Sequence, residues 1–116
     1  EGNQLLGASW GIMTDGFATD IAGHIKTINI DTKDIQSLGD KTPTGNLDGL
    51  ESDGNGSYFV TDWMAGKLLH ISPSGISTGL IQLEQGSADH TVLLEQNLVI
   101  IPMMLTGTIV ALEIKK

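Results

Sequence analysis

The chain has 116 residues, which fits one modest domain, and its 40% hydrophobic content is enough for a core, so disorder along the whole chain is excluded. The net charge of −8, with six lysines and no arginine, argues against binding to nucleic acid or to an anionic membrane, which require a basic face. A cation or a neutral polar ligand suits this charge better.

The absence of cysteine excludes disulfides, thiol nucleophiles and Cys-ligated zinc. The longest apolar run, residues 98–105, is interrupted by Pro102 and is far shorter than the ~20 residues of a membrane-spanning helix. We therefore expect neither a membrane span nor a targeting segment, and the compartment stays open. The chain opens with Glu1 and not with Met, which indicates a processed product or a piece of a longer chain.

Three parts of the chain read alike and define expected units at residues 5–46, 47–87 and 88–116. Each has a strand of β-branched or aromatic residues, a short break, a glycine and a second alternating strand. The three segments are GFATDIAGHIKTINI from Gly16, SYFVTDWMAGKLLHIS from Ser57 and NLVIIPMMLTGTIVALEI from Asn97. Together with fifteen glycines, this pattern predicts an all-β fold of short strands and tight turns.

Within the middle unit, alternation and turn residues predict four strands at residues 47–52, 57–61, 67–72 and 76–83. The segment DGNG from Asp53 contains residues that tolerate positive φ, and it predicts a hairpin turn between the first two strands. An EF-hand calcium loop is excluded, because Tyr58 stands where that loop requires glycine and Met64 where it requires glutamate.

The spacing of similar residues indicates a repeat in the low forties. Gly23, Gly66 and Gly107 are separated by 43 and 41 residues, and Asp20 and Asp62 are 42 residues apart. A period of this length with paired strands is typical of propeller blades, so we expect one domain, residues 1–116, of about three four-stranded blades. We expect Asp20 and Asp62 to accept hydrogen bonds from the turns that follow them.

Three blades make about half of a ring, because propellers usually close with about 4–8 blades. Half of a ring leaves two open, apolar blade faces, which are costly in water. Either the chain is a fragment of a larger propeller, or copies of it associate; a homodimer would close a six-bladed ring.

The middle unit resembles the blade pattern of the SMP-30/gluconolactonase/LRE-like family. The resemblance rests on LDGLESDGNG from Leu47, YFVTD from Tyr58, GKLLHI from Gly66 and PSG from Pro73, and it is weaker in the flanking units. It implies a six-bladed propeller with a divalent cation, often calcium, in its central channel. Many members of the family hydrolyse lactones or related esters.

The resemblance implies a metal-binding and catalytic role for Asp48, whose Asp-Gly pair matches the metal-binding aspartate of the family. The alternative for Asp48 is a simple turn at the entry to a strand. The family's asparagine ligand would fall at Leu6, so it is missing, and the glutamate ligand would belong to a blade outside this chain.

Asp89 lies 41 residues after Asp48 and is followed by His90, so one repeat later a second carboxylate and an imidazole are expected at the same channel. With Asp48 they would bind a divalent metal, expected to be calcium because hard cations prefer several convergent oxygen ligands. A metal there would polarise a lactone carbonyl. A surface loop or a structural hydrogen-bonded pair is the alternative for Asp89 and His90.

Trp10, Trp63 and Met103 are candidate ligand contacts, with packing between blades as the alternative. His24 and His70 are expected to be structural, because they fall in third strands away from the channel. Two classes of function remain open. The first is a metal-dependent lactone or ester hydrolase, and the second is a non-catalytic propeller that binds a small-molecule ligand or a protein partner.

Overall fold

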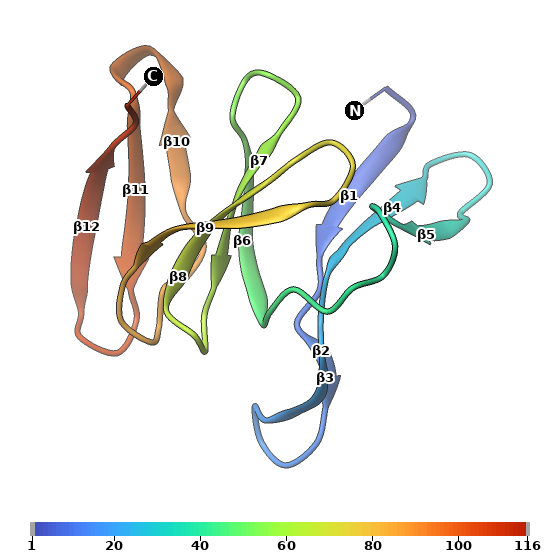
Figure 1. Ribbon diagram of the computed structural model, residues 1–116, viewed down its shortest axis with the longest axis horizontal. Helices are drawn as coiled ribbons and strands as arrows, with labels where there is room; N and C mark the ends of the chain where they lie inside the picture. Colours follow the sequence, from blue (N-terminus) through green and yellow to red (C-terminus); the bar gives the residue numbers. More distant parts are fainter. Residues whose placement is uncertain (1, 116) are drawn as a thin grey trace.

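The computed structural model describes residues 2–115, and this part of the chain is all-β, as the sequence predicts (Figure 1). Its twelve strands form three antiparallel sheets and one hairpin, and its helical content is a 3₁₀ turn at Leu94–Gln96. Between residues 2 and 115 there is no helix long and apolar enough to cross a membrane. The first and last residues of the expected domain, Glu1 and Lys116, lie outside the described range.

The middle sheet confirms the four strands predicted for the middle unit. Its order is β6 (Leu47–Ser52), β7 (Tyr58–Asp62), β8 (Lys67–Ile71) and β9 (Ser77–Gln82), with neighbours antiparallel. The predicted hairpin turn joins β6 to β7, and its Asp53 carboxylate accepts the N–H groups of Asn55 and Ser57 at 2.7 and 3.0 Å. Such side-chain bonds to the following backbone stabilise tight turns.

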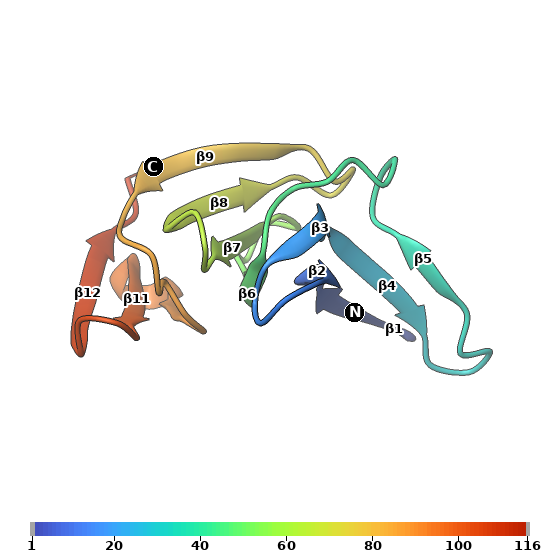
Figure 2. The same ribbon diagram turned by 90° about the horizontal axis from the view of Figure 1, so that it is seen from below.

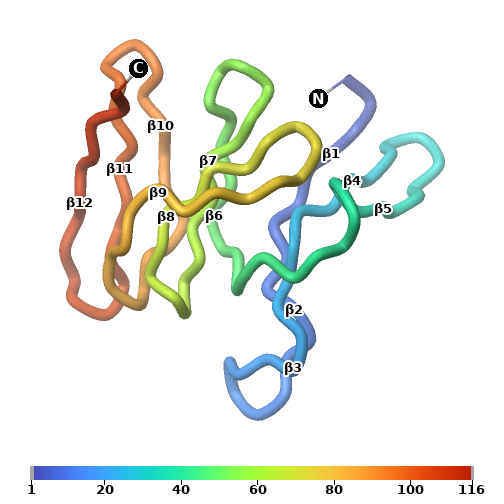
Figure 3. The backbone as a smooth tube through the Cα atoms, in the orientation of Figure 1, coloured from blue at the N-terminus to red at the C-terminus, as the bar shows by residue number. Residues whose placement is uncertain are grey.

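The two flanking sheets have three strands each in the described residues, so the expectation of four strands per unit holds only for the middle one. The N-terminal sheet consists of β1 (Gln4–Ala8), β4 (Ile25–Asn29) and β5 (Ile35–Ser37). The C-terminal sheet consists of β10 (Thr91–Leu93), β11 (Leu98–Met103) and β12 (Thr108–Glu113). A separate hairpin, β2 (Gly11–Met13) with β3 (Thr19–Ala22), lies between β1 and β4 in the chain and extends away from the N-terminal sheet (Figure 3).

The inserted hairpin disturbs the repeat in the first unit. Gly66 and Gly107 lie in matching turns, with φ of 68° and 69°, where their N–H groups bond to the carbonyls of the last residues of β7 and β11 at 2.9 and 3.0 Å. Gly23 is not in such a turn, because it forms a bridge with Gly45, and a Cβ on Gly23 would overlap the backbone of Ser9. Gly23 still directly precedes the end of its ladder, at His24, as Gly66 and Gly107 precede Lys67 and Thr108, so the expected equivalence holds in position although the inserted hairpin replaces the tight turn.

The middle sheet buries both of its faces. All five residues of β7 are buried, and their side chains alternate between two cores. Tyr58 and Val60 belong to the core shared with the N-terminal sheet, and Phe59 belongs to the core shared with the C-terminal sheet. Viewed from below, the three sheets fan out, with β6 and β1 toward the centre and β12, β9 and β5 at the periphery (Figure 2).

Candidate functional site

Equivalent positions at one edge of the three sheets carry large apolar side chains. Trp63 and Met104 are the first residues after β7 and β11. In the N-terminal sheet the N–H of Ser9 bonds to the carbonyl of His24 at 3.2 Å, which extends the β1–β4 ladder by one residue. Trp10 is therefore the first residue beyond the ladder, as Trp63 and Met104 are in theirs. We call Trp10, Trp63 and Met104, together with Phe17 of the β2–β3 hairpin, the tryptophan row.

Each member of the tryptophan row contacts the next, in the order Phe17, Trp10, Trp63 and Met104. The rings of Trp10 and Trp63 have centroids 5.9 Å apart and planes inclined by 50°, and the rings of Trp10 and Phe17 meet edge to face at 6.1 Å. At the other end, Nε1 of Trp63 donates to the sulfur of Met104 at 3.3 Å. Phe17 and Met104 are 68% and 65% exposed, and the two indoles are partly buried, so the row faces solvent.

The polar atoms of the row are already bonded within the protein. Nε1 of Trp10 donates to the carbonyl of Phe17 at 3.1 Å, and the Trp63 indole N–H is taken by Met104. The Asn46 side chain holds the backbone of Trp10 in place, because its amide donates to the Trp10 carbonyl and to Thr19 Oγ1 at 2.9 and 3.0 Å. A ligand would therefore meet aromatic faces and edges rather than indole donors.

Met103, the third expected ligand contact, lies inside the protein. Its side chain is 4% exposed and belongs to the core between the middle and C-terminal sheets, where the Ser87 hydroxyl lies 3.8 Å from its sulfur. Strand alternation places the next residue, Met104, at the surface. Sequence reasoning missed Met104 and Phe17, because the register that aligns Met104 with Trp63 is visible only once the strand pairing is known.

Asp48 lies at the start of β6 in an exposed position, close to the tryptophan row. The backbone N–H of Trp63 bonds to the carbonyl of Asn46 at 3.0 Å, and the carbonyl of Trp63 accepts the N–H of Gly86 at 2.9 Å. Trp63 is thus tied to both segments that lead into Asp48 and Asp89.

Asp48 and Asp89 interact as like charges. Partial burial first, and then the negative charge of Asp89, raise the pKa of Asp48 above its usual value. The bulge in β6 between Leu47 and Leu50 creates this approach, because it places Asp48 and Gly49 opposite a single residue of β7. A bound positive charge would relieve the repulsion between these two carboxylates.

Thr61 connects the two segments that carry these carboxylates. Its side chain is fully buried, its hydroxyl oxygen accepts the N–H of Gly49 at 2.8 Å, and its hydroxyl donates to the carbonyl of Ala88 at 2.9 Å. Gly49 allows the close approach, because a Cβ there would lie 2.5 Å from Nδ1 of His90 and 3.0 Å from the Cα of Asp89.

His90 is buried against Gly49. Its side chain is 4% exposed, and neither ring nitrogen has a partner at hydrogen-bond geometry. Burial lowers the pKa of His90, and the charge of Asp89 and the backbone of Phe59 oppose that shift only in part. The ring is therefore neutral at pH 7 and has unsatisfied buried polar atoms, which are rare in proteins.

The expected metal-ligand set is incomplete in this part of the chain. Among residues 2–115 no group of three or more histidine or acidic side chains is arranged to hold a metal ion. Asp48 and Asp89 supply two neighbouring carboxylates, whereas a calcium ion takes about 6–8 oxygen ligands. The described residues therefore fit at most one side of a cation site.

The observed strand pairing changes two of the residue correspondences that the sequence repeat predicts. Ser87 pairs with the last residue of β11 as Leu47 pairs with the last residue of β7, so Ser87 corresponds to Leu47. The counterpart of Asp48 is then Ala88, and Asp89 lies one position later. Leu6 lies in β1, which corresponds to β7 and not to β6, so comparing Leu6 with Asp48 was wrong.

Two other expectations about polar residues are confirmed. Asp62 accepts the N–H of Ala65 in the following turn at 3.0 Å, and His70 has a structural partner, with Nε2 2.9 Å from a carboxylate oxygen of Asp53. Asp20, expected to match Asp62, lies instead in the exposed strand β3 of the inserted hairpin.

Comparison of the chain with protein-family models, with curated proteins and with solved structures found no match.

Proposed function

We propose that this chain is a section of a β-propeller and that the edge carrying Asp48, Asp89 and the tryptophan row binds a small cationic ligand. The observation that carries the proposal is the like-charge pair beside an exposed aromatic row. A cation over a tryptophan face gains about 0.5–1 kcal/mol at an exposed site, and more when water is excluded. The same cation would relieve the repulsion between the two carboxylates.

A tryptophan fluorescence titration with tetramethylammonium chloride tests this binding, with sodium chloride as the ionic-strength control. Saturable quenching is expected in the wild type. The Asp48→Asn variant should bind roughly fivefold more weakly, since an exposed charge pair contributes up to about 1 kcal/mol. Asp31→Asn, which removes the same charge from the exposed β4–β5 turn, should leave the affinity unchanged. An equal response to both salts would contradict the proposal.

The remaining blades of the ring are provided, in this proposal, by a second copy of the chain. The outward faces of the flanking sheets carry exposed apolar side chains, including Leu5 and Ile35 on one side and Ile109 on the other, at 55%, 64% and 73% exposure. Such surface favours association. Light scattering should give the mass of a dimer, and a stable monomer at micromolar concentration would leave ring closure to the remainder of a longer chain.

A divalent-metal-dependent lactone or ester hydrolase is the second candidate. Two observations favour it: the Asp48–Asp89 pair and the unpartnered ring nitrogens of buried His90. Its other metal ligands would come from beyond the described residues. Calcium should then raise the melting temperature of the assembled protein in the wild type and not in Asp48→Ala, because a ligand that binds only the native state stabilises it. Chelator-sensitive lactone hydrolysis would establish the reaction, and its absence would leave the binding function.

A further inference from the structure

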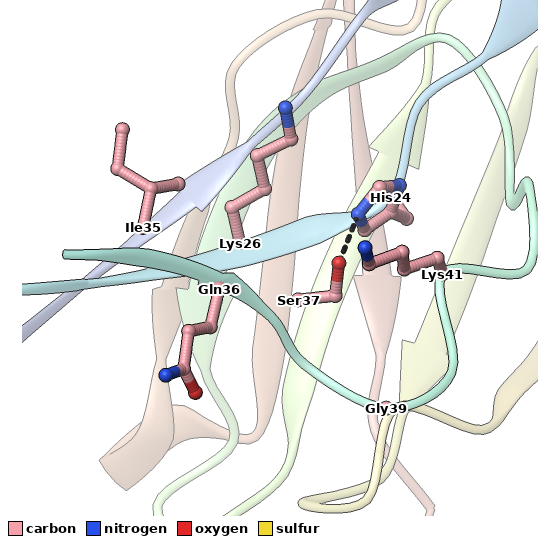
Figure 4. Close-up of a pocket in the computed structure, with 7 residues that line it drawn as sticks. All are labelled: His24, Lys26, Ile35, Gln36, Ser37, Gly39 and Lys41. Carbon is pink, nitrogen blue, oxygen red and sulfur yellow. Dashed lines mark hydrogen bonds between the residues drawn. The ribbon is translucent and has the colours of Figure 1, made fainter.

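An open pocket of about 530 Å³ lies on the N-terminal sheet, and no member of the tryptophan row lines it (Figure 4). Strands β4 and β5 and the segments that adjoin them form its walls. It is lined by His24, Lys26, Ile35, Gln36, Ser37, Gly39 and Lys41. Two of the six lysines of the chain therefore meet a histidine and a serine in one pocket.

The pocket is locally positive in a protein with a net charge of −8. No acidic residue lines it, and the ion pair found among residues 2–115 joins His70 to Asp53, so neither Lys26 nor Lys41 has a carboxylate partner there. The nearest acidic residue in sequence, Asp40, instead accepts the backbone N–H of Thr42 at 3.0 Å. Two ammonium groups without counter-ions favour a bound anion.

His24 and Ser37 lie at the centre of the pocket and contact each other. Nε2 of His24 is 2.8 Å from Oγ of Ser37, and in Figure 4 the ammonium group of Lys41 points toward the same place. Burial, and then the charges of Lys26 and Lys41, lower the pKa of His24. These two lysines are the charged groups that act on the ring, Lys26 from β4 and Lys41 from the segment after β5, and in Figure 4 the ammonium group of Lys26 extends away from the His24–Ser37 contact.

The segment that carries Lys41 has a constrained backbone. Lys41 has φ of 69°, a left-handed conformation that is unfavourable for a lysine and is found mostly where surrounding structure imposes it. Gly39 packs against the turn after β8, because a Cβ there would lie 2.6 Å from the carbonyl of Ser74. Leu38, on the same side of Lys41, donates its N–H to the carbonyl of Ile25 at 2.9 Å, and on the other side of Lys41 the N–H of Thr44 bonds to the carbonyl of Gly23 at 2.7 Å. The backbone that presents Lys41 is thus fixed at both ends.

We propose that this pocket binds a small tetrahedral dianion, such as a phosphate group, between Lys26, Lys41, Ser37 and His24. The lysines supply charge, a protonated His24 donates Nε2–H to Oγ of Ser37, and the Ser37 hydroxyl is then free to donate to an anion oxygen. A bound dianion stabilises the imidazolium form, so binding takes up a proton wherever the free protein leaves His24 neutral. Affinity should therefore rise as the pH falls from 8 to 6.

Calorimetric titration with sodium sulfate is the most direct test, because the charge of sulfate is constant over this pH range. We expect one saturable site whose affinity is severalfold higher at pH 6 than at pH 8. Lys41→Gln should weaken binding about tenfold, whereas Lys67→Gln, which removes an equal charge from β8 outside the pocket, should have little effect. His24→Gln should retain binding but lose its pH dependence.

A parallel titration compares inorganic phosphate with a phosphate monoester. Monoester binding at least as tight as that of phosphate identifies the group as the end of a larger ligand, and weaker binding identifies the free ion. Either result supports the site if the Lys41→Gln substitution weakens the binding. The proposal is overturned if no dianion shows saturable binding, or if Lys67→Gln and Lys41→Gln weaken it equally.

Discussion

Trp10 and Trp63 pack against each other at the edge of two neighbouring sheets, with ring centroids 5.9 Å apart and ring planes inclined by 50°. This contact joins residues that are distant in sequence, and it places two aromatic faces beside the segments that lead to Asp48 and Asp89. The proposed binding edge depends on it.

Two indoles in contact at this distance, with inclined ring planes, should couple electronically and give an exciton couplet in the far-ultraviolet circular dichroism spectrum. We expect the couplet in the wild type and its loss in both Trp10→Phe and Trp63→Phe. Both tryptophans are only partly buried and phenylalanine keeps an aromatic ring at each position, so the fold should be kept in both variants. Persistence of the couplet in either variant would show that the signal does not arise from this pair.

Gly49→Ala should destabilise the protein by about 1–3 kcal/mol, because its Cβ would meet the His90 ring and the backbone of Asp89. Denaturant unfolding measures the effect. Gly79 in β9 is a matched control, since a Cβ there has no atom within 4 Å. Equal stability of Gly49→Ala and Gly79→Ala would be inconsistent with the close approach of the two segments.

Thr61→Val should also destabilise the protein, by about 2 kcal/mol or more. The change keeps the shape of the side chain but leaves the N–H of Gly49 and the carbonyl of Ala88 without their buried partner. Thr106→Val, in the exposed turn after β11, should change the free energy of unfolding very little. A similar loss in both variants would argue against the bridging role of Thr61.

Stability should depend on pH through Asp48. Because its pKa is raised in the folded protein, the native state holds this proton more tightly than the unfolded chain. The resulting stabilisation is present below the unfolded pKa of ~3.9 and is lost as the pH rises through the folded value. Asp48→Asn should therefore melt at a higher temperature than the wild type at pH 7 and at the same temperature at pH 3. If Asp48→Asn melts at a lower temperature than the wild type at pH 7, the ionised Asp48 stabilises the folded protein, which would contradict the raised pKa.

The middle sheet could be predicted from sequence because local signals agree there. Alternating side chains mark β7 and β8, and Asp53 with its glycines marks the turn before them. The all-β class followed from the same local signals. Nothing non-local was needed, because each strand pairs with the next one in the chain.

The first unit could not be aligned correctly, because the β2–β3 hairpin lengthens it without a sequence signal that separates insertion from repeat. Asp20, which lies in that hairpin, was therefore matched to the wrong position. The alignment of the candidate site failed in the same way. Asp48 and Asp89 were found by their spacing, but their register is set by the bulge in β6 and by the bridge of Ser87 to Met103. The pocket around His24 could not be predicted either, because the strands and the loop that line it leave no periodic pattern in the sequence.

The proposed binding edge is tested most directly by measuring the pKa of Asp48 by NMR with and without saturating tetramethylammonium. A cation bound beside the carboxylate pair favours the ionised form, so the raised pKa of Asp48 should fall when the probe binds. An unchanged pKa of Asp48 at a probe concentration that saturates the fluorescence signal would contradict binding at this edge.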